Sequence, residues 1–386
     1  MGLEAFSGVA VLSHGQVFEN HAVLTENGVV KALVETSAIP TDARRHDFPG
    51  LTLAAGLIDA QVNGGGGVLF HQGVDIEALG KMVGAHRASG ATALLATLIS
   101  GSKEDMLHAL HITRQFRQKY GGDSSGIIGL HLEGPFLNPE RHGIHPEKNI
   151  LPPDADFIAG LDFTGCGVVM MTIAPEMFQP GEIKKLSAKN IRLAAGHSMA
   201  DEKALQRGKA EGLTGVTHLF NAMGGPKGGG MSARNPGLSG LALDDPDLWC
   251  SLIADGQHVE TAMIRLATKA KGKGKIFLVS DAMPPSGEHP PHDFDLMGQK
   301  IFVKNGRCED AGGHLAGSAA TLFECFRFAV QQANLPLQEA HAMASLYPAQ
   351  FLKIEAKQGS LLPGRLANIL VLDEKLGLKK VIAGNK

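Results

Sequence analysis

The chain has 386 residues, more than a single hydrophobic core usually supports, so we expect one large domain with a smaller attachment. Hydrophobic residues make up 44% of the chain and charged residues 19%, and the formal net charge is -3, which argues against attraction to nucleic acid or to anionic membranes. No apolar stretch reaches the length of about 18 residues that a membrane span needs, and the four cysteines form no Cys-x-x-Cys pair, which favours a reducing cytosol. We therefore expect a cytoplasmic protein whose partner is a small molecule.

Both ends of the chain are predicted to form short strands. Residues 1–53 contain short apolar or alternating runs, such as 9–12 and 29–34, separated by glycine and polar turns, as small antiparallel strands do. Residues 359–386 have the same character. We predict one small β-sandwich domain built from 1–53 and 359–386, with a second domain at 54–358 between them. Two separate terminal modules are the alternative.

The middle of the chain, from Gly56 onward, alternates apolar strand-like runs with helix-like stretches, which implies a parallel sheet. Eight strands are predicted, the number that closes a (β/α)8 TIM-like barrel of the α/β class. The predicted strands span residues 57–63, 91–98, 127–133, 168–173, 191–197, 216–219, 248–255 and 276–281. Helices are predicted at 75–89, 102–119, 180–189, 201–211 and 260–271, several of them opened by Ser, Asp or Pro.

Two regions depart from this alternation. The connection after the sixth strand, residues 221–247, is rich in glycine, proline and polar residues, which predicts a long loop rather than a crossover helix. After the eighth strand, residues 285–313 are predicted to form a loop and a short hairpin, followed by helices at 318–333 and 337–352.

Four polar side chains end four of the apolar runs: Glu133, His197, His218 and Asp281. The carboxyl ends of barrel strands meet at one mouth, so these residues are predicted to become neighbours. Two histidines and a glutamate are a ligand set of catalytic zinc, with a fourth position open for water. The alternatives are a buried ion pair of Glu133 with Arg or Lys, and core histidines at 197 and 218.

Asp281 is predicted to face the same mouth without ligating. A divalent metal lowers the pKa of its water to about 7, so a neighbouring carboxylate can take that proton and later return it to a leaving group. A helix N-cap or a fourth metal ligand is the alternative for Asp281. On the first strand, Gln61 and Asn63 share one face, and amides are poor transition-metal ligands.

Six ordered motifs together resemble the amidohydrolase superfamily, and the resemblance covers nearly the whole chain. They lie at residues 56–64, 131–138, 195–198, 217–223, 254–258 and 279–283. The resemblance implies metal ligation by Glu133, His197 and His218, with Asp281 as general base and acid. The Gln61-Val-Asn63 sequence is similar to the branch with a single metal, so these two amides are expected to hydrogen-bond around the bound water.

The resemblance also implies the reaction, which is hydrolysis of the N-acetyl amide of a hexosamine 6-phosphate in amino sugar catabolism. The sequence does not show whether the gluco or the galacto epimer of this sugar phosphate is the substrate. Rival readings are an amidohydrolase acting on a cyclic amide or dipeptide, and a scaffold that has lost its metal. One divalent metal per subunit is expected, with zinc first and Fe²⁺, Mn²⁺ or Co²⁺ as alternatives.

Substrate contacts are likewise implied by resemblance. His145 matches the family's carbonyl-polarising histidine, although the residues alone do not favour it over His142. Contacts to the sugar and phosphate match Asn221, Ala222, Arg234, His258 and the backbone of Leu315, Ala316 and Gly317. The family supplies the arginine from the neighbouring subunit, which implies a homodimer, and a solvated loop charge is the alternative for Arg234. The segment 224–234 is longer and richer in glycine than the family pattern.

Overall fold

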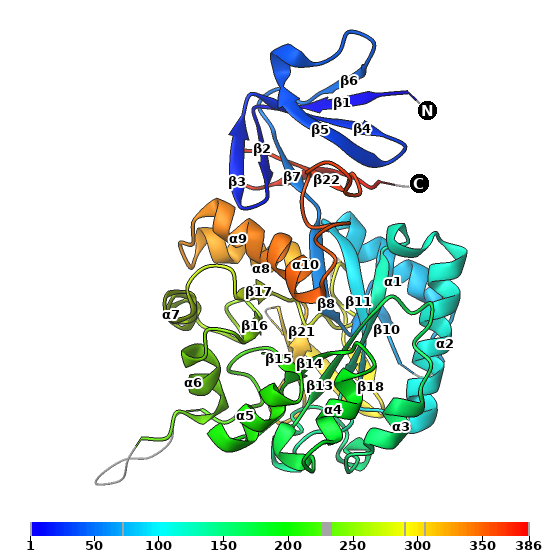
Figure 1. Cartoon of the computed structure of the whole chain (residues 1–386), viewed down its shortest axis with the longest axis vertical. Helices are drawn as coiled ribbons and strands as arrows, with labels where there is room; N and C mark the ends of the chain where they lie inside the picture. Colours follow the sequence, from blue (N-terminus) through cyan, green and yellow to red (C-terminus); the bar gives the residue numbers. More distant parts are fainter. Residues whose placement is uncertain (1, 72, 226–233, 289–290, 305, 385–386) are drawn as a thin grey trace.

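The large domain is a parallel barrel wrapped by helices (Figure 1). The computed structural model describes residues 2–384 except 72, 226–233, 289–290 and 305. Eight parallel strands are neighbours in chain order from β8 to β17, which confirms the predicted α/β barrel. They are β8 (Leu57–Val62), β11 (Ala91–Ile99), β12 (Ile127–Glu133), β13 (Val168–Ile173), β14 (Arg192–Ala195), β15 (Leu213–Val216), β16 (Trp249–Leu252) and β17 (Ile276–Leu278).

Helices follow the strands, and five of the ten described begin after a residue whose side chain accepts from a backbone N–H of the first turn. Asp75 accepts from the backbone of Ala78 at the start of the first helix, and Ser102 forms a capping box with Asp105 at the second. The barrel helices are α1 (Ile76–Ala88), α2 (Lys103–Lys119), α3 (Ala155–Gly160), α4 (Glu182–Ser187), α5 (Glu202–Ala210), α6 (Gly237–Asp244), α7 (Thr261–Lys271), α8 (Leu322–Gln331), α9 (Leu337–Ala344) and α10 (Leu346–Leu352).

Several barrel strands are a few residues shorter than predicted, and three predicted elements of the barrel domain differ more clearly. The sixth strand spans Leu213–Val216 rather than 216–219. Its start was not predicted because Gly215 resembles a turn residue, and it ends before His218, whose φ of 31° is incompatible with a strand. The predicted loop 221–247 contains α6, which begins after a proline. The predicted helix 337–352 is broken at Ser345, since Pro348 cannot continue a helix through the carbonyl four residues earlier.

The small domain consists of two sheets that draw on both chain ends (Figure 1). One sheet has the order β5-β4-β1-β6 and the other β23-β22-β7-β2-β3. The strands are β1 (Glu4–Ser7), β2 (Ala10–Ser13), β3 (Gln16–Glu19), β4 (His21–Glu26), β5 (Val29–Glu35), β6 (Arg44–Asp47), β7 (Thr52–Ala55), β22 (Ile369–Leu372) and β23 (Leu378–Ile382).

These sheets are mixed rather than purely antiparallel as expected, because β1 pairs with β6, and β2 with β7, in parallel. The pairing of β7 with β22 is antiparallel and joins the first segment of the chain to the last. The predicted boundary between residues 53 and 54 falls inside β7. The division into 1–53 with 359–386 and 54–358 stays a prediction.

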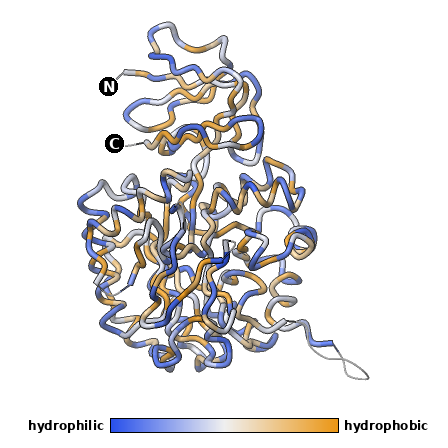
Figure 2. The backbone as a smooth tube through the Cα atoms, turned by 180° about the vertical axis from the view of Figure 1, so that it is seen from behind, coloured by the Kyte–Doolittle hydropathy of each residue, from blue (hydrophilic) through white to orange (hydrophobic). Residues whose placement is uncertain are grey.

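A further antiparallel sheet lies between the eighth barrel strand and the last helices. It contains β18 (Phe294–Leu296), β19 (Gln299–Lys304), β20 (Arg307–Glu309) and β21 (Leu315–Ser318), where a single short hairpin was predicted. The two-stranded pair β9 (Gly64–Gly65) and β10 (Val68–Leu69) follows β8. In Figure 2, hydrophobic stretches run along the strands of both domains. Within the described residues, no helix is long and apolar enough to cross a membrane.

The barrel closes at a seam between its first and last strands. Strands β8 and β17 form no continuous ladder; a single bridge pairs Val62 with Ala282, and the Ala282 carbonyl accepts from the backbone of Asn63 at 2.9 Å. Side chains complete the closure, because the buried Asp59 carboxylate accepts from the Ser280 hydroxyl at 2.5 Å. The contacts at the seam therefore hold the backbone on both sides of Asp281, which lies between Ser280 and Ala282.

Candidate metal centre and active site

The strand ends bring Glu133, His197 and His218 together, although they lie on three different strands or in the turns after them. Glu133 is the last residue of β12, and the histidines follow the ends of β14 and β15 by two residues. One ligand atom from each lies within 4.8 Å of the others, and all three residues are buried. His218 Nε2 lies 2.9 Å from Glu133 Oε1 and 3.1 Å from His197 Nε2, and His197 Nε2 lies 3.4 Å from Glu133 Oε1.

The donor set fits a divalent metal. His197 Nδ1 lies 2.8 Å from the carbonyl oxygen of Arg141, which can only accept, so Nδ1 carries the proton and the Nε2 lone pair faces Glu133 and His218. Among the described residues, Glu133 forms no ion pair with lysine or arginine, which disfavours the alternative of a structural ion pair. Three converging donors, two imidazoles and a carboxylate, match a catalytic zinc set.

Electrostatics within the cluster keep Glu133 ionised. Burial alone would raise the pKa of Glu133, but its contact with His218 and the positive charge that the nearby imidazoles can carry hold it well below the usual range. Burial opposes the charged form of His218, yet the hydrogen bond and the charge of Glu133 raise its pKa. The carboxylate is thus present as the anion that metal ligation requires.

Asp281 lies beside the cluster and is held by the two first-strand amides. Its Oδ1 accepts from Asn63 Nδ2 at 2.7 Å and from Gln61 Nε2 at 3.0 Å, and the same Gln61 nitrogen donates to Glu133 Oε1 at 2.8 Å. Burial, followed by repulsion from Glu133, raises the pKa of Asp281 to about 6. Because both amides hold Oδ1, Oδ2 is left for proton transfer, and a raised pKa suits a group that takes and returns a proton.

His145 enters the site from the loop after β12, and its tautomer is set by Ser100. The Ser100 backbone N–H donates to His145 Nδ1 at 3.2 Å, and the Ser100 hydroxyl lies 2.8 Å from the same atom. Burial and the neighbouring His197 keep the pKa of His145 well below its usual range. The neutral ring therefore carries its hydrogen on Nε2, which lies 3.8 Å from Glu133 Oε2. His142 instead turns its Nδ1 to the carbonyl oxygen of His145.

A pocket of about 240 Å³ opens over these groups. Its lining includes most of the predicted substrate contacts: Asn221, Ala222, His258, Leu315 and Gly317. Apolar side chains that sequence reasoning did not select complete the wall, and they are Ile99, Ile144 and Met283. A Cβ on Gly317 would lie 2.6 Å from Met283 Cγ, so only glycine lets this backbone line the pocket.

His258 is oriented by a buried carboxylate. Its Nδ1 lies 2.7 Å from Asp255 Oδ2, which also accepts from the Ser318 hydroxyl at 3.0 Å. Burial would raise the pKa of Asp255, but the hydrogen bond and charge of His258 lower it. His258 is thus held by an ionised partner with Nε2 left for the pocket, an arrangement suited to anion recognition.

Two predicted contacts lie outside the pocket lining. Arg234 is exposed and lines a separate surface cavity with Asp201 and Gln206. Ala316 is buried in the apolar cluster beneath β21 and does not line the pocket. Most of the predicted glycine-rich segment 224–234 falls on 226–233, outside the described residues, so its reach stays a prediction.

Several residues of the site have a strained backbone conformation, which could not be predicted from the sequence. His197, His218 and Asp281 have φ values of 47, 31 and 52°, in the left-handed region that side chains disfavour. Ala222, in the pocket wall, has a φ of 47°. Such conformations cost about 1–3 kcal/mol each and cluster at functional sites. The turns after β14, β15 and β17 thus aim the three polar side chains inward.

Comparisons with known proteins agree with this geometry. A model of the Amidohydrolase family matches residues 52–386. The N-acetylglucosamine-6-phosphate deacetylase of Haemophilus influenzae is 33% identical over 363 residues, covering 92% of this chain and 91% of that protein. The N-acetylgalactosamine-6-phosphate deacetylase of a Shewanella species is also 33% identical, over 370 residues, covering 95% and 91%.

A solved structure is similar over the entire chain. The crystal structure of N-acetylglucosamine-6-phosphate deacetylase from Pasteurella multocida superposes with a TM-score of 0.91 at 30% identity, covering 100% of this chain and 99% of that chain. The family match and the relatives agree with the motifs at the strand ends. The chain belongs to the amidohydrolase family and is a hydrolase that acts on an amide bond.

Proposed function

We propose that the protein hydrolyses N-acetyl-D-glucosamine 6-phosphate to D-glucosamine 6-phosphate and acetate, as a step of amino sugar catabolism. The observation that carries this proposal is the convergence of Glu133, His197, His218 and Asp281 at one pocket. The names of the relatives add the substrate class, a phosphorylated N-acetyl hexosamine.

The metal site would hold one divalent ion per subunit through Glu133, His197 and His218. Zinc suits two imidazoles and a carboxylate, and Fe²⁺, Mn²⁺ and Co²⁺ are the alternatives. When bound, such an ion supplies Lewis-acid chemistry, acidifying a water and polarising the amide carbonyl. We expect no second tightly bound metal at the first strand, because it presents Gln61 and Asn63 where imidazoles would be needed.

The chain's own groups then move the protons. Asp281 takes a proton from the attacking water through Oδ2, while Gln61 and Asn63 hold Oδ1 in place. The N–H at His145 Nε2 donates to the carbonyl oxygen as negative charge develops there. Asp281 returns its proton to the amide nitrogen as the C–N bond breaks, so a neutral amine and acetic acid leave, and the acid releases its remaining proton to solvent to give acetate.

The phosphate and sugar contacts are proposed for the outer part of the pocket. His258, held by Asp255, would pair with phosphate or a sugar hydroxyl, and the backbone around Asn221, Ala222 and residues 315–317 would line the sugar. Arg234 lies outside the pocket of its own chain. We therefore propose a homodimer in which Arg234 of the partner subunit completes the phosphate site.

Acetate release tests the substrate. Rates would be measured side by side on N-acetylglucosamine 6-phosphate, its galacto epimer and unphosphorylated N-acetylglucosamine. We expect the gluco phosphate to react fastest and the unphosphorylated sugar slowest. Equal rates with and without phosphate would remove the phosphate roles of His258 and Arg234. A faster galacto phosphate would favour the second candidate function, to which the Shewanella relative points.

Mixing two defective variants tests the dimer. Arg234→Ala lacks the shared arginine, and Asp281→Asn lacks the base, so a hybrid dimer contains one complete site. In an equal mixture that exchanges subunits at random, about half of the dimers are hybrids, and each hybrid has one complete site of two. The mixture should therefore recover about a quarter of wild-type activity. If mixing restores nothing although hybrid dimers form, Arg234 does not act across an interface.

A further inference from the structure

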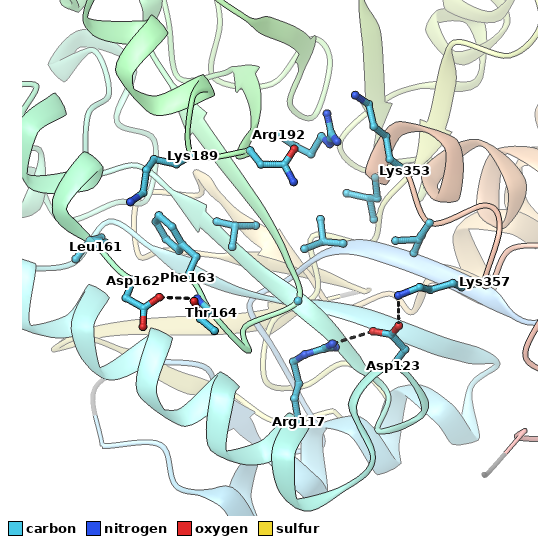
Figure 3. Close-up of a pocket in the computed structure, with 16 residues that line it drawn as sticks. Arg117, Asp123, Leu161, Asp162, Phe163, Thr164, Lys189, Arg192, Lys353 and Lys357 are labelled. Atoms are coloured by element: carbon cyan, nitrogen blue, oxygen red, sulfur yellow. Dashed lines mark hydrogen bonds and ion pairs between the residues drawn. The ribbon is translucent and has the colours of Figure 1, made fainter.

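A second cavity lies at the opposite end of the barrel, where the strands begin (Figure 3). Its volume is about 750 Å³, against about 240 Å³ for the candidate active-site pocket. The starts of β13 and β14, helix α2 and the segment after α10 form its walls. None of the residues assigned to amide hydrolysis lines it. A cavity of this size can hold a small metabolite.

The charge of this cavity is positive. Five cationic side chains line it against two carboxylates, and the five are Arg117, Lys189, Arg192, Lys353 and Lys357. One carboxylate, Asp123, is already paired with both Arg117 and Lys357, at 2.8 Å each. The other, Asp162, faces Arg114 outside the lining at 3.4 Å. Each of the two carboxylates thus already has a cationic partner.

Three cations remain without a partner. The side chains of Lys189, Arg192 and Lys353 form no hydrogen bond and no ion pair within 4.0 Å to the residues that the structure describes. Figure 3 shows Arg192 and Lys353 on one side of the cavity, opposite the cluster of Arg117, Asp123 and Lys357, whereas Lys189 lies apart with its ammonium group pointing away from them. Like charges in one cavity repel one another, and a bound anion removes that cost.

Arg192 is the least solvated of the three. It is the first residue of β14, is partly buried, and carries five N–H donors in a planar fork. Burial lowers its pKa, and Glu355 opposes this only by charge at a distance, without an ion pair. A guanidinium withdrawn from water without a partner is unfavourable, so the site is suited to an acceptor that enters from solution.

Lys353 is held at the cavity by a costly backbone conformation. It caps the end of α10 with φ at 58°, in the left-handed region where glycine is the least costly residue. Lysine at this position places a cation on the cavity wall next to the start of β14. The chain thus tolerates an unfavourable backbone conformation at the residue that brings a positive charge to the cavity.

We propose that this cavity is a second anion site, which binds a small phosphate-bearing molecule between Arg192 and Lys353. The guanidinium of Arg192 can pair with two phosphate oxygens, and the ammonium group of Lys353 adds a point charge. The proposal concerns a different end of the barrel from the metal centre and does not depend on the proposed hydrolytic function.

Equilibrium dialysis with labelled inorganic pyrophosphate tests this site. The purified wild-type protein, at 0.15 M salt, would be compared with Arg192→Gln/Lys353→Gln for both stoichiometry and affinity. We expect the double variant to lose one class of bound pyrophosphate, with affinity at the site falling roughly tenfold or more. His258→Asn separates the active-site pocket, because it should leave this class of binding intact.

A charge-matched variant distinguishes a built site from general attraction. Arg265→Gln/Lys269→Gln removes two positive charges from α7, outside the cavity, and should bind as the wild type does. Equal binding by wild type and Arg192→Gln/Lys353→Gln, or an equal loss in the α7 variant, would overturn the proposal. If the Arg192 variant does not fold, Lys353→Gln alone replaces it, since this lysine is exposed, and the same outcomes apply.

Discussion

Replacing Asp59 with asparagine should stabilise the metal-free protein more at alkaline than at acid pH. Asp59 is fully buried at the barrel seam and accepts from the Ser280 hydroxyl at 2.5 Å, from the Ser280 backbone at 3.2 Å and from the Gln61 backbone at 3.3 Å. Burial nevertheless raises its pKa from 3.8 to about 7, because the cost of desolvation exceeds the gain from these hydrogen bonds.

The sign and size of this pH effect on the free energy of unfolding follow from the linkage between proton binding and folding. A carboxyl whose pKa is raised by folding binds its proton more tightly in the folded state, so stability is lost as the pH rises from about 4 through about 7. A shift of roughly three units corresponds to about 4 kcal/mol at full ionisation. Between pH 5 and pH 8 the loss is about 2–3 kcal/mol, because part of it is already present at pH 5. Asparagine has no such dependence.

Urea unfolding measures this difference. Wild type and Asp59→Asn would be unfolded at pH 5 and pH 8 in the presence of a chelator, with the exposed Asp244→Asn as a charge-matched control. The stability difference between Asp59→Asn and wild type should shift by about 2–3 kcal/mol in favour of the variant from pH 5 to pH 8. A difference that does not change with pH would show that Asp59 is ionised in the folded state at pH 5. The hydrogen bonds from Ser280 and Gln61 would then outweigh burial.

Three further predictions concern the metal centre. Asp281→Asn should keep its metal and lose turnover by a factor of about 10²–10⁴, measured by acetate release and elemental analysis; near-normal turnover in metal-replete protein would remove Asp281 from the mechanism. Glu133→Gln should lose bound metal after dialysis, because an amide is a poor ligand beside two imidazoles, and full metal content would show that Glu133 is not a ligand. Gln61→Ala should lower turnover or metal affinity by about 10–100-fold, since it removes the donor shared by Glu133 and Asp281. Wild-type values for both quantities would mean that this shared donor is dispensable.

The strand-end residues could be predicted because apolar runs mark buried parallel strands and the barrel brings their ends together. Glu133, His197, His218 and Asp281 needed only this periodicity and the rule that strand ends share one mouth. The turn conformations that aim them inward could not be predicted, since non-glycine residues with positive φ have no sequence signature there.

Other features depended on tertiary contacts. Choosing His145 over His142 required Ser100, which approaches His145 only in the folded barrel. Helix α6 was missed because Gly237 and Gly240 have low helix propensity, yet burial of Leu238 and Ala242 stabilises it. In β15, Gly215 resembles a turn residue in sequence but lies within the strand, where a Cβ would approach Phe351 Cε2 to 3.1 Å.

The pairing of β7 with β22 has a consequence for synthesis. A ribosome delivers β7 before the whole barrel and β22 after it, so the edge of β7 that receives β22 stays unpaired while the barrel is being made. Exposed strand edges pair readily with other chains. The nascent protein therefore carries an unpaired strand edge that can bind other chains until residues 369–372 emerge, and β22 then covers this edge.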